Sequence, residues 1–474
     1  MEGARRLETF LTLSDLIDSG QFQRAEKLIK TNPPEGPLGL IHHAEVHTYF
    51  GRLDEAGELL ERIQPRDLAI DEAARYALAR GEWYYWRFEY EPAEQQFHMA
   101  EHMYRFIDDE FGLAKTLYDL GRLKRREAKF EAAQQLLHQA LDLMSDHRGE
   151  KKEFLQALLQ FNLGVCAHQL GQLDTATELY SSAMVALNKL ERGIYYGATL
   201  NSFGTLLRRM GKYEEAFSMI KEAVSIFEQF ASFEQLANAM NNLALTLVRL
   251  EQYEAAETIL QESGELYQRV GSITGSSIYL ETFAELYLQS GALHKAEKYA
   301  SQAIQQADLS HNEFVKAEAL ITLGRIEIKR NDFYAAAKVL KEALEISQKL
   351  NSKMLQTAAQ LYLAECELPT APVKAQQRLT QVREALESYH DVQLQQELER
   401  IRQRAKGERL KITADNKLII DGNFLPNWYA AKEALETFLL KNALRQSEGN
   451  LTKAGKILGI TKVHVHDKKK QYGL

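Results

Sequence analysis

The chain has few of the residues that build disulfide frameworks, flexible linkers and membrane spans. Its 474 residues include two cysteines, eight prolines and 27 glycines. No apolar run approaches the ~20 residues that cross a bilayer. Cys166 and Cys366 lie far apart without metal-ligand spacing around them, which favours free thiols in a reducing compartment. The N-terminal residues lack the pattern of a secretory signal, so we expect an ordered, mainly helical, cytoplasmic protein.

Sequence motifs of common enzymes are also missing. The chain contains no GxxxxGK[ST] phosphate loop, no HExxH and no GxSxG. His43 and His47 lie one helical turn apart and could share a metal, but no third ligand with a known spacing accompanies them. We therefore expect no enzyme, no cofactor and no metal site.

The net charge of −8 conceals an uneven distribution. Residues 401–474 contain 15 Lys and Arg but seven Asp and Glu, whereas residues 1–400 contain 43 basic and 59 acidic residues. An acidic body with a basic end suits a scaffold joined to an anion-binding segment, although lysines that only solubilise the end would give the same balance.

One local pattern recurs along most of the chain: a small or polar residue, then an aromatic residue or leucine, then alanine. Five copies begin at equal intervals, at Gly171, Gly211, Glu251, Gly291 and Asn331. Looser copies begin at Gly20, Gly51, Phe88 and Ala128. The first residue of a copy ends one helix in a tight or left-handed turn, and the alanine lets the next helix approach closely. The pattern predicts nine turns, each between two amphipathic helices.

Small residues also recur in the helix before these turns. The preceding helix has one seven positions before the turn, at Gly81, Gly121, Gly164, Gly204, Ala244, Ala284 and Gly324. The pattern resembles the tetratricopeptide repeat in a variant with long helices, over roughly residues 5–368. The resemblance implies an all-α superhelical solenoid of about nine ~40-residue repeats with a degenerate cap, over residues 1–368. The polar stretch 369–406 is expected to be a C-terminal capping helix.

In the tetratricopeptide family, the first helix of each pair lines a groove that commonly holds a peptide or a partner helix. Asparagines in this helix often clasp the peptide backbone, and an amide suits this role because it both donates and accepts hydrogen bonds. Basic side chains on the same face would favour an acidic ligand segment. The alternative role for all these side chains is hydrogen bonding and ion pairing within and between repeats. The resemblance places these residues in the groove: Asn162, Asn201, Asn241, Asn242, Arg122, Arg125, Arg126, Arg208, Arg209 and Arg325.

The C-terminal region has a different pattern. Residues 409–420 alternate apolar and polar side chains around Asp415 and Asn416, which predicts a small β-hairpin within a linker, 407–425. A helix is expected from Trp428 to Ser447, with its apolar face at Trp428, Ala431, Leu435, Phe438 and Leu439 and its continuation at Ala443. Asn450 and Thr461 can cap two further short helices separated by Gly459, which predicts a helix-turn-helix over 426–474.

This segment resembles the C-terminal module of the factor for inversion stimulation and of NtrC-type regulators. The resemblance rests on Gly449-Asn450, Ala454, Leu458-Gly459-Ile460, Lys468 and Tyr472-Gly473-Leu474. It implies a homodimer formed by the long helix, with the last helix in the major groove of DNA. It places Thr461, Lys462 and His464 at base edges, and Lys453, His466, Lys468 and Lys470 at phosphates.

This chain departs from the family pattern at several positions. Lys462 and His464-Val465 replace Arg and Thr-Leu, Lys469 replaces a core leucine, and Gly455 replaces an alanine. An ammonium reads guanine less specifically than a bidentate guanidinium does. The changes fit either a relaxed sequence preference or a module kept for dimerisation alone.

Two functions follow from these patterns. The first is a homodimeric bacterial transcriptional regulator whose solenoid binds a protein or peptide and whose C-terminal module binds double-stranded DNA. The second is a scaffold or adaptor for a signalling protein, in which the module only dimerises.

Overall fold

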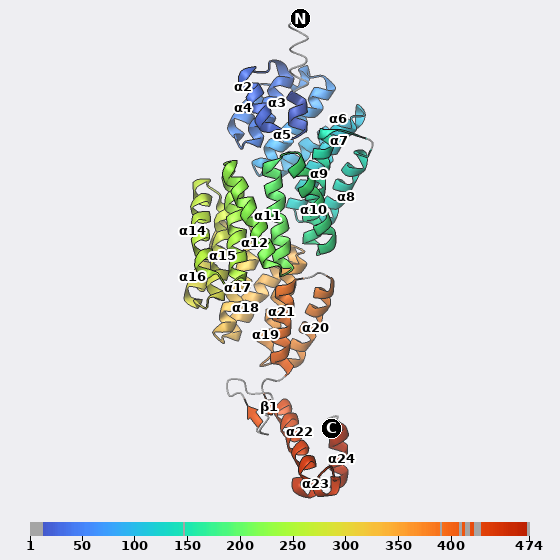
Figure 1. The fold of residues 1–474 in the computed structure, drawn as a ribbon, viewed down its shortest axis with the longest axis vertical. Coiled ribbons are helices and arrows are strands. Elements are labelled where there is room, and N and C mark those ends of the chain that lie inside the picture. The colour runs from blue at the N-terminus through green and yellow to red at the C-terminus, as the bar shows by residue number, and fades with distance from the viewer. Residues whose placement is uncertain are drawn as a thin grey trace. The chain divides into compact units, whose positions relative to one another are not determined.

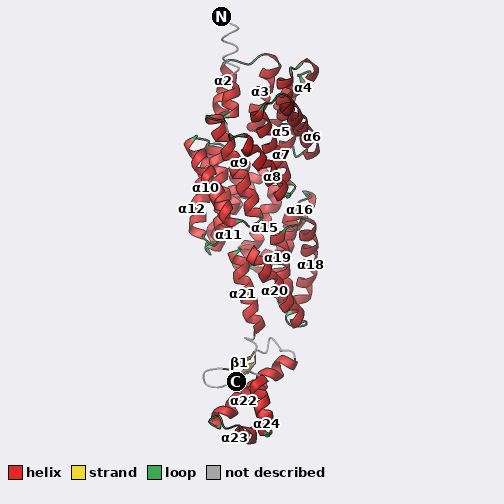
Figure 2. Cartoon of the chain, turned by 90° about the vertical axis from the view of Figure 1, so that its right-hand side faces the viewer, coloured by secondary structure: helices red, strands yellow, loops and turns green. Residues whose placement is uncertain are grey.

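The computed structural model describes residues 13–145, 147–388, 391–406, 410–412, 418–420 and 428–471. The chain divides into two units, residues 1–290 and 291–474. This division lies inside the predicted solenoid, at the turn that contains Gly291. Figure 2 shows that helix accounts for nearly all of the described chain. No helix among the described residues has the length and apolar character needed to cross a membrane.

The first unit is a series of antiparallel helical hairpins (Figure 1). Residues 13–18 are helical and precede α2. The further elements are α2 (Phe22–Thr31), α3 (Gly36–Tyr49), α4 (Leu53–Glu61), the 3-10 helix η1 (Pro65–Asp67), α5 (Ile70–Trp86), α6 (Tyr90–Phe106), α7 (Glu110–Arg126), α8 (Phe130–Leu143), α9 (Glu150–Gln169), α10 (Leu173–Lys189), α11 (Gly193–Arg209), α12 (Tyr213–Gln229), α13 (Phe233–Arg249), α14 (Tyr253–Arg269) and α15 (Ile273–Gln289).

The second unit continues with helices and ends in a small helical segment. Its elements are α16 (Leu293–Leu309), α17 (Glu313–Lys329), α18 (Phe333–Lys349), α19 (Lys353–Glu367), α20 (Pro372–Ser388), α21 (Val392–Lys406), β1 (Leu410–Ile412), β2 (Leu418–Ile420), α22 (Trp428–Gln446), α23 (Leu451–Leu458) and α24 (Lys462–Gln471). The strands β1 and β2 pair antiparallel, with Leu410 opposite Ile420 and Ile412 opposite Leu418.

The turn residues have the conformation that the repeat pattern predicts. All nine first residues of the repeated pattern have a positive φ, including the non-glycine residues Phe88, Ala128, Glu251 and Asn331 at 57° to 64°. A left-handed residue at this position lets the amides beyond the helix end bond back to its last carbonyls. In the hairpin α9–α10, for example, Gln172 N donates to Ala167 O at 2.8 Å.

The small residues pack as their spacing predicts. The alanine of the turn pattern is fully buried in each of the later repeats, for example Ala176, Ala216 and Ala256 at 0% exposure. In the helix before the turn, a Cβ added to Gly164 would lie 2.9 Å from the ring of Tyr180, which is itself fully buried. The small residue therefore makes room for a large side chain of the paired helix.

The segment 369–406 differs from the single capping helix expected. It forms two helices, α20 and α21, and α20 pairs with α19 as a tenth hairpin. The separation follows from Asp391, whose Oδ1 accepts from Leu394 N at 3.0 Å and so caps a new helix start. Helix α21 is held to α19 by Arg400 and Arg404, which bind the buried carboxylate of Glu365 at 2.7 to 2.9 Å.

Candidate functional site

The asparagines predicted to line the groove lie on three neighbouring helices of the first unit, α9, α11 and α13. Asn242 Nδ2 donates to Asn201 Oδ1 at 3.1 Å, so this pair links α13 to α11. Asn162 and Asn241 are 2% and 3% exposed. Their Oδ1 atoms are buried and accept no hydrogen bond from the described residues. These two amide oxygens therefore lack the donor that a buried acceptor needs.

Arg122 is engaged inside the protein. It is 9% exposed, and its Nη1 lies 2.6 Å from Asp119 Oδ1 and 3.4 Å from Glu82 Oε1. Its guanidinium also lies over the ring of Tyr85, at 4.5 Å from the centroid. Arg122 therefore forms ion pairs within and between repeats, because Asp119 belongs to its own helix α7 and Glu82 to α5.

The other arginines of the predicted groove have different surroundings. Arg126 donates to Tyr85 Oη at 3.1 Å, and Arg209 donates to His168 O at 3.1 Å. Arg125 is half-buried, and its Nε finds no acceptor within the described part of the chain. Arg208 is half-buried on α11. Arg325 lies in the second unit, with its guanidinium 5.4 Å from the ring centroid of Tyr362.

The carboxyl groups around Arg122 titrate abnormally. Burial raises the pKa of Glu82 to about 7, and the charge of Asp119 adds to this shift although Arg122 opposes it. Burial raises the pKa of Tyr85, but three nearby arginines outweigh it and bring the pKa to about 8. Burying several charges together costs folding free energy, so such a group either links neighbouring helices by ion pairs or belongs to a binding site.

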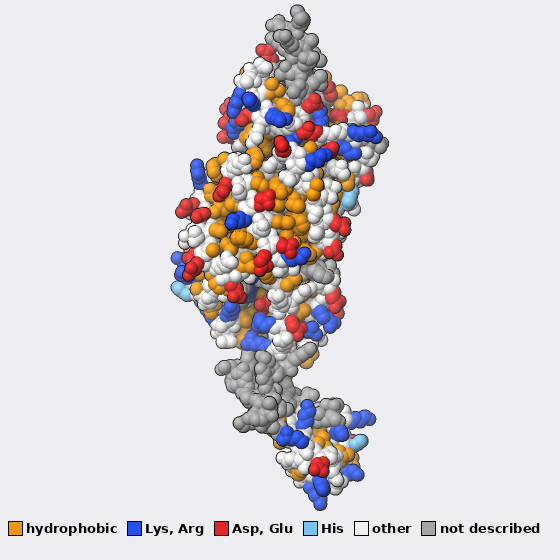
Figure 3. All heavy atoms as spheres, in the orientation of Figure 1, with side chains coloured by type: hydrophobic (Ala, Val, Ile, Leu, Met, Phe, Trp, Pro, Cys, Tyr) orange, Lys and Arg blue, Asp and Glu red, His pale blue; other side chains and the backbone are white. Residues whose placement is uncertain are grey.

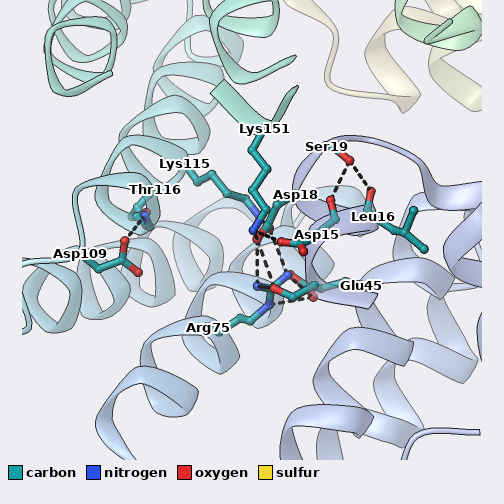
Figure 4. A network of polar contacts seen from close by, with 12 residues as sticks. Asp15, Leu16, Asp18, Ser19, Glu45, Arg75, Asp109, Lys115, Thr116 and Lys151 are labelled. Atoms are coloured by element: carbon teal, nitrogen blue, oxygen red, sulfur yellow. Dashed lines mark hydrogen bonds and ion pairs between the residues drawn. The ribbon is translucent and has the colours of Figure 1, made fainter. Parts of the chain in front are cut away.

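A second ionic cluster joins the N-terminal helices to the repeats, and no motif in the sequence pointed to it. The cluster contains Asp18, Glu45, Arg75, Lys115 and Lys151, and Figure 4 shows these side chains converging from different helices. Asp18 is 7% exposed and accepts from Lys115 Nζ at 2.9 Å and from Arg75 Nη2 at 3.2 Å. Burial would raise the pKa of Asp18, but the three cations outweigh it and hold the pKa far below its usual range.

The same N-terminal residues contact helices much later in the chain. Arg192, the residue before α11, donates from Nε to Ser19 O at 2.7 Å and pairs with Glu150. Phe22 stacks on Tyr49 with ring centroids 3.9 Å apart. Beside them lies a pocket of about 490 Å³. The first helices are thus fixed to α7, α9 and the start of α11.

His43 and His47, which have metal-ligand spacing in the sequence, lie close together in the structure. His43 Nε2 and His47 Nε2 lie 2.9 Å apart on α3. Burial lowers the pKa of both, that of His47 to about 4. No third histidine, cysteine or carboxylate completes a metal-binding group with them among the described residues.

The three-helix tail, residues 428–471, has its own small core and defined caps. Leu440, Ala443, Ala454 and Val465 are at most 2% exposed and pack together. Asn450 Oδ1 accepts from Thr452 N and Lys453 N at 3.1 Å, which caps α23. Gly459 ends α23 with φ of 69°, and Thr461 Oγ1 accepts from His464 N at 3.2 Å. Two short helices are therefore joined by a tight turn.

The geometry of this turn explains why position 455 is a glycine. A Cβ added there would lie 2.7 Å from Ile460 O, so the glycine permits the close approach of α23 to the turn. The cost of a helical glycine is about 1 kcal/mol relative to alanine, and a steric overlap with a backbone carbonyl exceeds it.

The predicted apolar face of α22 is buried in the tail only in part. Ala443, which continues that face, packs with Leu440 in the core formed with α23 and α24, whereas Leu435 and Leu439 are 46% and 45% exposed. Side chains of Trp428 and Ala431 lie outside the described residues. The exposed pair is spaced four residues apart and so forms a stripe on the outside of α22.

Most predicted DNA-contacting residues are accessible. Lys453, Thr461, Lys462, His464, His466 and Lys470 are exposed. Lys468 differs, because its Nζ lies 2.5 Å from Glu436 Oε2 on α22 and it is only partly exposed. The exposed carboxylate of Asp467 lies on the same helix and was not singled out in the sequence. Figure 3 shows basic side chains around apolar ones on this part of the molecule.

Comparison with known proteins identifies the repeat. Residues 155–229 and 235–308 match one model of the tetratricopeptide repeat, and residues 317–350 match another. The chain carries tetratricopeptide repeats. It is 24% identical over 257 residues to the mitochondrial tetratricopeptide repeat protein 19 homolog of Drosophila melanogaster. The aligned region covers 52% of this chain and 69% of that protein.

Solved structures show the same fold for the tetratricopeptide repeats. A Rap protein complexed with competence and sporulation factor has a TM-score of 0.58 at 16% identity, covering 73% of this chain and 99% of that one. The apo form of the quorum sensor NprR from B. thuringiensis has a TM-score of 0.52 at 13% identity, with the same two coverages. Aspartyl phosphate phosphatase F from Bacillus subtilis has a TM-score of 0.50 at 15% identity, covering 72% and 93%.

Proposed function

We propose that this chain is a non-enzymatic transcriptional regulator that binds a peptide or protein segment on its tetratricopeptide repeats and DNA through its tail. The observation that carries the ligand site is the pair of buried, unsatisfied amide oxygens of Asn162 and Asn241. A buried acceptor without a donor costs about 1–3 kcal/mol, and a bound peptide that uncovers these atoms would remove that cost with its main-chain N–H groups. The related folds include a Rap protein complexed with competence and sporulation factor and the quorum sensor NprR, which favours a signal as the ligand.

The charge on these helices favours an acidic ligand. Arg125 offers a buried Nε with no acceptor in the described part of the chain, and Arg208 lies half-buried on α11. Arg122 is less suited to direct contact, because Asp119 and Glu82 already neutralise it. We therefore assign the ligand site to α7, α9, α11 and α13, with Arg125, Asn162 and Asn241 at its centre.

A peptide display library enriched in acidic residues, selected on the full chain, tests the ligand site. Asn162→Ala and Asn241→Ala should each weaken the selected peptide, whereas Asn188→Ala, an exposed position on α10, should not. Equal binding by all three variants would place the ligand elsewhere.

We propose that α23 and α24 form a DNA-binding helix-turn-helix and that two copies of the chain pair through the stripe of Leu435 and Leu439. The tail contains nine Lys and Arg but four Asp and Glu. The capped turn leaves Lys462, His464 and Lys470 accessible to a duplex. Dimerisation through α22 would place two copies of α24 at neighbouring half-sites.

The scaffold alternative is supported by one observation. Lys468, which the resemblance places at a phosphate, pairs with Glu436 within the tail, and Asp467 adds a negative charge to α24. Under this alternative the tail dimerises and binds no DNA.

Anisotropy of the full chain on a labelled random-sequence duplex, measured over a salt series, separates the two functions. DNA binding should weaken with a slope of roughly −0.9 per phosphate contact in log–log form. Charge reversal of Lys462 and Lys470 should abolish it, and this pair is preferable to one including Lys468, whose ion pair with Glu436 also supports the tail. A full chain that dimerises but binds no duplex would establish the scaffold.

A further inference from the structure

Among the described side chains of the tail, the most exposed large apolar one lies on the helix that we assign to DNA. Val463 is 66% exposed in the first turn of α24, between the exposed residues Lys462 and His464. Two positions later Val465 is fully buried in the tail core. The fold therefore uses Val465 for stability and leaves Val463 in water. A single exposed valine is ordinary on a protein surface, so its surroundings decide what it could contact.

The two short helices on either side of the turn before Val463 carry exposed cations and a second exposed apolar side chain. Ile460, three residues earlier in the turn, is 40% exposed, and Lys453, Lys456 and Lys462 are exposed on α23 and α24. The N-terminal end of α24 adds the positive end of its helix dipole. A second copy of the same face would be repelled by these like charges. The surface instead fits a polyanion that carries apolar groups between its phosphates.

The major groove of DNA has this chemistry. Phosphates border it, and the 5-methyl group of thymine is its one apolar feature at the base edges. An anionic lipid surface also combines negative charge with apolar groups, but the exposed carboxylate of Asp467, one turn beyond Val463, opposes its approach. Asp467 is compatible with the major groove, where a carboxylate can accept from the cytosine amino group.

We propose that Val463 contacts the 5-methyl group of thymine in the major groove, so that the tail prefers sites with thymine opposite the start of α24. The proposal rests on the DNA-binding function proposed above and adds to it a base preference. In this chain, the apolar contact of Val463 would supply specificity that the ammonium of Lys462 gives only weakly.

The test compares thymine with uracil, which lacks only the methyl group. A duplex is first selected from a random-sequence pool with the full chain. It is then synthesised with deoxyuridine replacing thymidine, one position at a time, and affinities are measured by anisotropy. At one or two positions the loss of the methyl group should weaken binding about threefold to fourfold, which is the factor expected for one apolar carbon group returned to water.

Variants assign the preference to the residue. Val463→Ala should narrow the difference between the thymine and uracil duplexes, because only Cβ then remains to meet the methyl group, whereas Val185→Ala should keep the full preference. Val185 is a matched control because it is a valine of similar exposure, 67%, on helix α10 of the first unit. Circular dichroism should show unchanged helix content for both variants, since neither side chain is buried.

The outcomes separate this inference from the proposed function. No binding of any duplex by the full chain would overturn both. Duplex binding without a difference between thymine and uracil, or with a difference that Val463→Ala retains, would overturn only the inference. Association with phosphatidylserine vesicles that depends on Val463 would assign this face to a membrane and overturn it as well.

Discussion

Replacing Asp18 by asparagine should loosen the N-terminal helices from the rest of the first unit. The carboxylate of Asp18 is almost fully buried and lies within 3.2 Å of nitrogens of both Lys115 and Arg75. In the variant Arg75 keeps Glu45 at 3.0 Å, but Lys115 loses its close anion. Removing one partner of a buried ion pair costs about 3–5 kcal/mol, because the other charge stays buried without compensation.

Hydrogen exchange is the suitable assay, because stacked repeats open locally rather than in one transition. Amides of residues 13–31 should lose about 3–5 kcal/mol of protection in Asp18→Asn, whereas those of α13 should keep theirs. Asp15→Asn is the matched control. Asp15 is 61% exposed and its pairing with Lys151 should contribute less than about 1 kcal/mol.

The difference between wild type and Asp18→Asn should also depend on pH. The pKa of Asp18 lies far below its ordinary value of 3.8 in the folded protein, so the folded state favours the charged form. Its contribution is present above this ordinary value and is lost as the pH falls below it. A loss of protection no larger than that of Asp15→Asn, or one that grows on acidification, would refute the reasoning.

Three further predictions concern single side chains. Because burial raises the pKa of Glu82 to about 7, the folded state holds its proton longer than the unfolded state. Wild type should therefore lose stability as the pH rises from about 4.5 to 7, and Glu82→Gln should flatten that decline in thermal unfolding. Gly164→Ala should lower stability by about 1–3 kcal/mol despite the better helix propensity, because its Cβ would lie 2.9 Å from the Tyr180 ring; an unchanged melting temperature would contradict this. Asn450→Ala should cost about 1 kcal/mol of protection in residues 451–458, and Asn450→Asp should restore it.

The helical repeats could be predicted because their information is local. A positive φ at Glu251 or Asn331 follows from the residues within one turn of it, and the buried Ala216 follows from a fixed spacing along the chain. The two helices of residues 369–406 were harder to predict. The second helix starts at Asp391 because this one side chain caps it, and an aspartate in such a polar stretch can also lie within a continuous helix. The nine turns were therefore predicted individually, whereas the break within 369–406 was not.

The partners of the candidate site residues could not be predicted in the same way. Arg122 binds Glu82 from the preceding repeat, and the ionic cluster joins residues as distant in the sequence as Asp18 and Lys151. In the tail, Lys468 meets Glu436 from a different helix. A sequence pattern places a charge on a helix face, but whether that charge meets a ligand or a neighbouring helix depends on packing between distant segments.

The spacing of left-handed residues sets the length changes that the chain can accommodate. Between Gly171 and Asn351 a residue with positive φ recurs at one constant interval, which is half of a repeat, at the end of each helix. A deletion of half a repeat in this range would keep every turn in phase but would exchange the two kinds of helix. A bulky residue such as Tyr180 would then face another bulky residue where Gly164 now makes room. Removing a whole repeat restores both the turns and the packing. Length variation among natural or engineered versions of this chain should therefore occur in steps of one full repeat, because shorter steps disturb either the turns or the packing between helices.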